Sequence, residues 1–297
     1  MAPPRAATAD ELARVHDTGY LDDIARLAGR PAMLDADTFM SPESRDIALL
    51  AAGAAVQAAE HAIDRGDAAF ALVRPPGHHA EADKAMGFCL FNNVAVAAAA
   101  AIARGLERVA IVDIDVHHGN GTQAIFYRDP RVLYVSTHQF PFYPGTGAAT
   151  EAGQAAGEGF TVNVPMAAGC TDADFLLVHR AIVAPVLDAF APQLTLVSAG
   201  YDAHEDDPLA SMRMTAAGYA AVIAGLRRAA AAHGALALVT EGGYDLPAMA
   251  ACLESSFAAI DRDGDPLESD ASAAASSRGE RAVAAARTAL KPYWREL

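Results

Sequence analysis

Asp113-Ile114-Asp115-Val116-His117-His118-Gly119-Asn120-Gly121 is the stretch that decides the fold. It directly follows Arg108-Val109-Ala110-Ile111-Val112, whose apolar, β-branched interior predicts a strand buried on both faces. Side chains alternate along an extended backbone, so Asp113, Asp115 and His117 are expected to project to one side. The polar side chains that could bind a ligand or react therefore begin where the buried strand ends.

Two carboxylates and an imidazole that converge on one point favour a metal site, because burying such charges unpaired costs several kcal/mol or more. The alternative is a solvated turn with incidental acids. That alternative is weaker, because Gly119 and Gly121 already supply a turn without them.

Length and composition favour an ordinary globular protein. The 297 residues allow one large α/β domain or two smaller ones, and 53% of them are hydrophobic and 20% charged. The formal net charge of -15 argues against a general nucleic-acid-binding surface. It is compatible with cationic small molecules or lysine-bearing peptides as partners.

The cysteines and the N-terminus predict a cytoplasmic protein with no membrane partner. Cys89, Cys170 and Cys252 are odd in number and lack CxxC spacing, which indicates neither a disulfide framework nor a zinc knuckle. The N-terminal segment has no apolar h-region, and the apolar run 94–103 is too short to span a bilayer.

Strands alternate with helices along the chain, which predicts an open, mainly parallel sheet with helices on both faces. The predicted strands cover residues 69–73, 108–112, 131–136, 194–197 and 235–239. The predicted helices cover 9–15, 18–27, 42–65, 94–104, 172–190 and 216–233, with a further helix from Pro247. Residues 33–40 are predicted to be a loop, and a Gly/Ala-rich loop runs through Gly159.

The domain organisation follows from a change in composition near residue 261. We expect a single catalytic domain over 1–260, a flexible Asp-, Ser- and Ala-rich connection over 261–279, and a C-terminal helix over 280–297. Trp294 is expected on the packing face of that helix.

Four of the buried strands release polar, glycine-containing clusters at their carboxyl ends. The clusters are 74–80, 113–121, 198–204 and 240–245. In open parallel sheets, ligands bind outside those ends. The sequence therefore predicts one active site at the carboxyl edge of the sheet.

Asp115, His117 and Asp202 form a candidate metal-binding set of one histidine and two carboxylates. Without a thiolate, the set suits zinc and tolerates iron(II) or another divalent ion, and three protein ligands leave positions open for water and substrate. Asp113 is better placed behind the metal, where it would accept a hydrogen bond from a histidine.

The histidine pair His78-His79 follows the first of these strands on a turn fixed by two prolines and a glycine. A lone histidine is more often structural, but a pair beside a metal edge suits proton transfer to and from water and a leaving amine. Tyr244, after two glycines, is a candidate oxyanion donor, although a GGY sequence alone is a weak signal. Together these groups indicate metal-assisted amide hydrolysis.

Several motifs together resemble the histone deacetylase family, within the arginase/deacetylase fold, and more closely its class II and bacterial deacetylase-like branch. They are RPPGHHA at 74–80, GFCLFNN at 87–93, DIDVHHGNGTQ at 113–123, YPGTG at 143–147, SAGYDAH with DPL over 198–209, and EGGY at 241–244. The resemblance runs from about His16 to Ile260.

The resemblance implies roles for the residues at the matching positions. The metal would be zinc, held by Asp115, His117 and Asp202, with His79 as the main general base and acid. His78 would tune His79 electrostatically, and Asp113 would orient His78. Asn120 stands where class I members have an acid, so His79 should be less basic. Tyr244 would activate the acetyl carbonyl.

The resemblance also implies a substrate tunnel. Phe88 and Tyr143 would wall it, and the Gly87 carbonyl would accept the substrate amide hydrogen. Leu209 fills the position where polyamine-selective relatives carry an acid, which leans toward acyl-lysine or leaves selectivity open. A monovalent cation, K⁺ or Na⁺, is expected near Asp113, Asp115, His117 and Ser136.

One departure from the family pattern concerns the N-terminus. The chain begins late compared with the family's catalytic domains, so we expect changes at the sheet edge, at one tunnel wall and at the acid on the pocket rim. Such a change would widen the pocket or call for a neighbouring subunit, and a homo-oligomer is therefore one expectation.

The preferred hypothesis is a zinc amidohydrolase that removes acetyl from acetyl-lysine or a related acylated amine. An acetylpolyamine amidohydrolase is the main rival, since an acidic surface suits a small cationic substrate. A two-metal arginase-like ureohydrolase is less favoured, because Asp202 is followed by Ala203-His204 and not by a second carboxylate two residues on. A non-catalytic acyl-lysine binder would be expected to have lost His79 or Tyr244.

Overall fold

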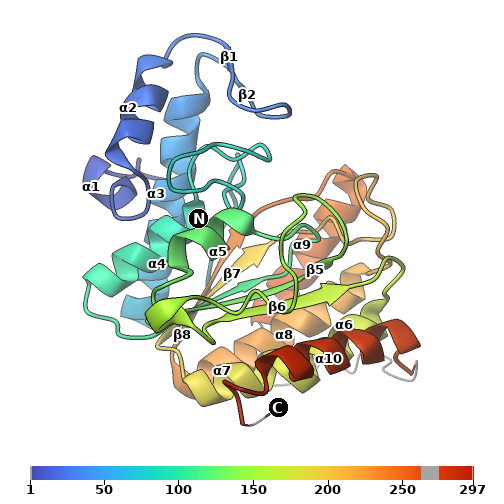
Figure 1. Cartoon of the computed structure of the whole chain (residues 1–297). Helices are drawn as coiled ribbons and strands as arrows, with labels where there is room; N and C mark the ends of the chain where they lie inside the picture. The colour runs from blue at the N-terminus through green and yellow to red at the C-terminus, as the bar shows by residue number, and fades with distance from the viewer. Residues whose placement is uncertain (1, 262–273, 296) are drawn as a thin grey trace.

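The computed structural model describes residues 2–261, 274–295 and 297. Its centre is a six-stranded, all-parallel sheet in the order β3-β8-β7-β4-β5-β6, with helices on both faces (Figure 1). The strands are β3 (Ala69–Ala71), β4 (Val109–Asp113), β5 (Val132–Gln139), β6 (Thr161–Met166), β7 (Leu194–Ala199) and β8 (Ala235–Thr240). This arrangement confirms the predicted α/β class.

The helices cover the sheet in two layers. They are α1 (Ala9–Leu12), α2 (Thr18–Arg26), α3 (Ser44–Arg65), α4 (Asn93–Ala103), α5 (Asn120–Phe126), α6 (Asp172–Val178), α7 (Ala184–Phe190), α8 (Ala216–His233), α9 (Leu246–Asp261) and α10 (Ser277–Leu290). Helices α3 and α4 pack on one face, and α8 and α10 pack on the other (Figure 1).

The alternation of side chains along β4 gives each layer its own core. Val109 and Ile111 belong to the core under α3 and α4, whereas Ala110 and Val112 belong to the core under α8. Because both faces are covered, every residue of β4 is buried, as expected for a central parallel strand. Asp113 is the last residue of β4, so its carboxyl group is buried at the strand end.

Helix α4 shows how local sequence stops and starts the elements around the site. The Asn92 side chain accepts the Ala95 N–H and caps the helix, and Gly105 with φ of 103° follows its end. The Asn92 amide also donates to the carbonyl of Ala80, just beyond the histidine pair. The cap therefore ties the start of α4 to the site.

The structure corrects several predicted boundaries. The strand β6 was missed, since Asn163 and Pro165 interrupt its apolar pattern, and proline is tolerated there because β6 is an edge strand. Residues 33–40 are not a plain loop, because β1 (Ala32–Met33) and β2 (Phe39–Met40) pair antiparallel as a short hairpin. Helix α5 was also missed, and α3 begins at Ser44 rather than at Pro42.

Two further helix predictions need correction. The single helix predicted over 172–190 contains a π-helical segment, η2 (His179–Val183), between α6 and α7. The C-terminal helix is α10, which begins three residues before residue 280 and ends at Leu290, so Trp294 lies beyond it and donates to the Gly159 carbonyl. Most of the connection predicted over 261–279 lies outside the described residues.

Among the residues that the structure describes, no helix is both long and apolar enough to cross a bilayer.

His16 links the N-terminal helices to the site-bearing loops and makes stability depend on pH. Its Nδ1 lies 3.0 Å from the Glu81 carbonyl, and its Nε2 accepts the Asn92 N–H at 3.0 Å. Burial lowers the pKa of His16 from 6.5 to about 4. The unfolded chain therefore binds a proton more tightly than the folded chain, and the stability from neutral His16 is lost as the pH falls from 6.5 toward 4.

We therefore predict that His16→Gln reduces the acid sensitivity of folding. The loss in free energy of unfolding between pH 7 and pH 5 should be smaller in the variant by about 2 kcal/mol, because one buried titrating group is gone. Urea unfolding at both pH values measures it, with exposed His61→Gln on α3 as the control. An equal loss in wild type and His16→Gln would contradict the assignment.

Candidate active site

The polar groups of the site arrive from the carboxyl ends of four neighbouring strands. Strand β3 leads to His78 and His79, β4 to the segment from Asp113 to His117, β7 to Asp202, and β8 to the segment from Glu241 to Tyr244. These strands are adjacent in the sheet, so their ends meet at one edge. The structure therefore brings together the residues that the sequence assigned to one site.

The path after β4 differs from the expected extended backbone. The strand ends at Asp113, and the chain then bends, so Asp115 and His117 lie in the bend. Asp113 faces His78, with Oδ2 3.0 Å from its Nδ1, and also accepts from the Tyr134 hydroxyl. Asp115 and His117 instead face Asp202.

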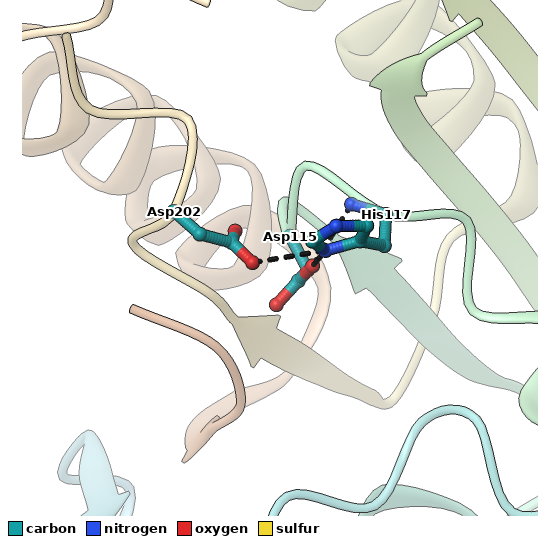
Figure 2. A group of neighbouring side chains, drawn as sticks. All are labelled: Asp115, His117 and Asp202. Carbon is teal, nitrogen blue, oxygen red and sulfur yellow. Dashed lines mark hydrogen bonds and ion pairs between the residues drawn. The ribbon is translucent and has the colours of Figure 1, made fainter. Parts of the chain in front are cut away.

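Asp115, His117 and Asp202 form the candidate metal-binding group (Figure 2). One ligand atom from each lies within 4.8 Å of the other two. His117 Nδ1 lies 3.0 Å from Asp202 Oδ2 and 3.2 Å from Asp115 Oδ1. A cation of about zinc's size prefers such nitrogen and oxygen ligands, so the group fits a divalent metal.

The charges at this group also favour a cation. Burial and the neighbouring Asp115 carboxylate raise the pKa of Asp202 to about 6. Burial opposes a charge on His117, yet its hydrogen bonds to Asp115 and Asp202 raise its pKa to about 10. Two buried carboxylates side by side thus hold a positive charge strongly, as a metal site must.

The backbone at residues 200 and 242 lies so close to the carboxylates of Asp115 and Asp202 that only glycine fits there. The Gly242 N–H donates to Asp115 Oδ2 at 2.8 Å, and the Val116 N–H donates to Asp202 Oδ1 at 2.9 Å. A Cβ at Gly242 would lie 2.3 Å from Asp202 Oδ2, and one at Gly200 would lie 2.0 Å from Asp115 Oδ2. These glycines let the backbone fix the carboxylate oxygens.

The two histidines that follow β3 have opposite proton affinities. Burial opposes a charge on His78, but the carboxylates of Asp113 and Asp115 outweigh it and raise its pKa well above the usual value. Burial and the charge on His78 lower the pKa of His79 well below the usual value. Their rings lie 4.0 Å apart, so a charged and a neutral imidazole are held side by side.

A pocket of about 200 Å³ opens above these groups. Its lining residues are Asp37, Pro76, His78, His79, Gly87, Phe88, His117, Phe142, Tyr143, Leu209, Gly242 and Tyr244. Phe88 and Tyr143 are 41% and 38% exposed, which places aromatic walls at the mouth. Gly87, with φ of 57°, runs so close to His79 that a Cβ would lie 2.3 Å from its ring.

Glu151 holds the loop that carries Tyr143 through hydrogen bonds to its backbone. This carboxylate accepts the backbone N–H groups of Gly147 and Ala148, each at 3.1 Å, and the amide of Gln123 at 2.7 Å. His118 holds the same loop through Thr146. Partly buried polar contacts therefore hold the loop that carries Tyr143.

Sequence reasoning missed three groups in or beside the pocket. Asp37, in the hairpin that was predicted to be a loop, lines the mouth, so an acid does stand at the rim. Phe142 stacks on His117 with ring centroids 5.4 Å apart. Glu241 received no predicted role beyond its place in the EGGY motif, although an acid directly after a buried strand was a usable signal.

Comparison with known proteins adds the family. A histone deacetylase domain matches residues 1–260. The chain belongs to the histone deacetylase family. This family consists of hydrolases, and the chain is accordingly an enzyme.

Two relatives and one solved structure illustrate the match. A probable deacetylase of Archaeoglobus fulgidus is 43% identical over 249 residues, which cover 82% of this chain and 68% of that protein. A histone deacetylase-like amidohydrolase of Pseudomonas aeruginosa is 45% identical over 251 residues, covering 82% and 65%. The crystal structure of the HDA15 HD domain superposes with a TM-score of 0.91 at 37% identity, covering 99% of this chain and 82% of that one.

The glycine contacts give a direct test of the metal group. Gly242→Ala should weaken the binding of a divalent metal, with zinc as the probe, by about 10–100-fold, because the added methyl group displaces the carboxylates that the backbone orients. Calorimetric titration of the metal-free protein with zinc measures the change. Gly225→Ala on α8 is the control, since its Cβ would meet nothing closer than 3.9 Å. Unchanged zinc affinity in Gly242→Ala would contradict the assignment.

Proposed function

We propose that the chain is a zinc-dependent deacetylase that hydrolyses the amide of acetylated lysine or of a related acylated amine and releases acetate. The observation that carries this proposal is the convergence of His79 and Tyr244 with the group Asp115, His117 and Asp202 around one aromatic-walled pocket. A zinc ion bound by that group would polarise the acyl carbonyl and acidify a water molecule.

His79 is the group suited to accept the proton of water. The Asn120 amide donates to Glu81, so its Oδ1 accepts a hydrogen bond from Nδ1–H of His79 at 2.8 Å. That bond leaves Nε2 of His79 without a proton and able to take one. The lowered pKa of His79 keeps it neutral before the reaction.

His78 supports the role of His79 in proton transfer. Its Nδ1–H donates to Asp113, which fixes the ring and stabilises the imidazolium. The positive charge beside His79 keeps the basicity of His79 low, so the proton that it takes up can pass on to the leaving amine. In this pair, His78 stays positively charged, and His79 takes up and releases the proton.

Tyr244 is the group suited to donate to the developing oxyanion. Burial and the charges of Asp115 and Asp202 raise the pKa of its hydroxyl, so the hydroxyl keeps its proton. Asp207 accepts the Tyr244 N–H at 2.7 Å and holds its backbone at the pocket. A protonated hydroxyl in a pocket of low polarity is an effective oxyanion donor.

The pocket walls support an acyl-lysine substrate. Phe88 and Tyr143 flank the entrance to His79, which suits the passage of a narrow alkyl chain, and the Gly87 carbonyl is proposed to accept the substrate amide hydrogen. Leu209 places an apolar side chain at the mouth of the pocket.

Three further properties belong to the proposal. A K⁺ or Na⁺ ion is proposed near Asp113, Asp115, His117 and Ser136. The protein is also proposed to be cytoplasmic and to form a homo-oligomer.

An acetylpolyamine substrate is the second candidate, and the acid at the mouth favours it. Asp37 lines the pocket. Burial raises the pKa of the Tyr143 hydroxyl, and the negative charges of Asp37 and Asp35 raise it further. A two-metal ureohydrolase has less support, because the described residues bring together a single group of three His, Cys, Asp or Glu ligands. A non-catalytic binder has less support, because His79 and Tyr244 both line the pocket.

The mechanism predicts that His79→Ala and Tyr244→Phe each lower deacetylation by about 10²–10⁴-fold without loss of zinc, because each removes a group acting on the reacting atoms. Turnover of acetyl-lysine peptides and acetylputrescine by zinc-loaded protein measures it, with exposed His61→Ala as the control. Near-normal activity of His79→Ala on every acylated amine would show the mechanism to be wrong.

A further inference from the structure

Glu241 is a buried carboxylate that the mechanism above does not use. It follows β8 directly and is 6% exposed. Its Oε2 accepts the backbone N–H of Gly77 at 2.6 Å and that of His78 at 3.1 Å. Its Oε1 accepts the Ser198 hydroxyl at 3.0 Å, so one side chain joins the ends of three strands.

The turn that Glu241 holds has little other support from the sheet. It follows β3, a three-residue strand at the sheet edge that pairs only with β8 within the described chain. On the far side of the turn, the Thr122 N–H donates to the His78 carbonyl at 3.1 Å. The peptide groups on both sides of the His78 side chain are therefore fixed, one by Glu241 and the other by α5.

The turn is also closely packed against the start of α4, so Glu241 and α4 together set its position. A Cβ at Gly77 would lie 2.4 Å from the Asn93 nitrogen, which shows that the backbone touches the start of α4. Without the Glu241 carboxylate, two buried N–H groups would lose their acceptor, and the turn would move to regain one.

We propose that Glu241 is a positioning residue for the histidine pair: it sets where His78 and His79 stand relative to Asp113, Asn120 and the metal-binding group. The effect on catalysis rests on the proposed function, whereas the effect on the two imidazoles does not. Position matters because a displacement of about 1 Å can cost about 10²-fold in rate.

Three substitutions separate position from charge. Glu241→Ala removes the acceptor, and Glu241→Asp keeps the charge but shortens the reach by one methylene group. Glu241→Gln loses the charge but keeps an oxygen at the same reach, while its NH₂ group can donate to Ser198. If the position of the acceptor oxygen matters and the charge does not, catalysis should be strongly impaired in Glu241→Ala and Glu241→Asp and only slightly impaired in Glu241→Gln.

Asp174 provides the matched control. It is fully buried and accepts the backbone N–H groups of Ser276 at 2.6 Å and Thr171 at 3.0 Å, at the N-terminus of α6. Asp174→Ala removes the same kind of clamp from a helix start that contributes no residue to the pocket. It should lower thermal stability and leave catalysis unchanged.

The kinetic experiment uses zinc-loaded protein and an acylated amine that the wild type turns over. We expect kcat to fall about 10–100-fold in Glu241→Ala and Glu241→Asp, with KM within about twofold and zinc content unchanged. In Glu241→Gln and Asp174→Ala, kcat should stay within about fivefold of wild type. A Gln variant as impaired as Ala, beside an active Asp variant, would overturn the proposal.

A second readout needs no activity. In metal-free protein labelled with ¹⁵N-histidine, the Nδ1 protons of His78 and His79 should give hydrogen-bonded signals from their contacts with Asp113 and Asn120. These signals should shift or vanish in Glu241→Ala and Glu241→Asp and persist in Asp174→Ala. Unchanged signals would overturn the proposal, whereas a wild type inactive on every acylated amine, with signals that respond as expected, would refute only the proposed function.

Discussion

Burial of carboxylates at one edge of the sheet is the constraint on which the rest of the structure depends. Asp113, Asp115 and Asp202 are fully buried, and Glu241 nearly so. An uncompensated buried charge costs several kcal/mol, so each of them requires hydrogen bonds or an opposite charge. Imidazoles and closely approaching glycine backbone supply part of this compensation, and the proposed metal at Asp115, His117 and Asp202 would supply the rest. The same groups would perform the proposed chemistry.

The sheet explains why this compensation gathers at the carboxyl ends of its strands. Four adjacent parallel strands end together, and the apolar residues behind those ends fix each strand along its length. The polar loops beyond them then differ by role, with His78 charged beside Asp113 and His79 neutral beside Asn120. Neighbouring groups whose environments push their pKa values apart are typical of paired acid and base functions.

Much of this was predictable from the sequence because buried strands and the glycine-containing clusters after them are local signals. The run before Asp113 predicted a central strand, and the polar clusters at the carboxyl ends of parallel strands predicted that Asp115 and His117 meet Asp202. The backbone after Asp113 bends, so the extended path that the spacing predicted there was wrong. Asp37 and Phe142 were not predictable in the same way, because each reaches the pocket through tertiary packing of a loop. Strand β6 was missed because edge position, which permits its Pro165, is not a local property.

X-ray absorption at the zinc edge of the zinc-loaded protein tests the central claim most directly. The account predicts one zinc per chain, with nitrogen and oxygen neighbours at about 2.0–2.2 Å and no sulfur, as expected for Asp115, His117 and Asp202. It also predicts that Asp202→Ala reduces the bound zinc. Sulfur neighbours near 2.3 Å, a second zinc per chain, or an unchanged spectrum in Asp202→Ala would contradict the account.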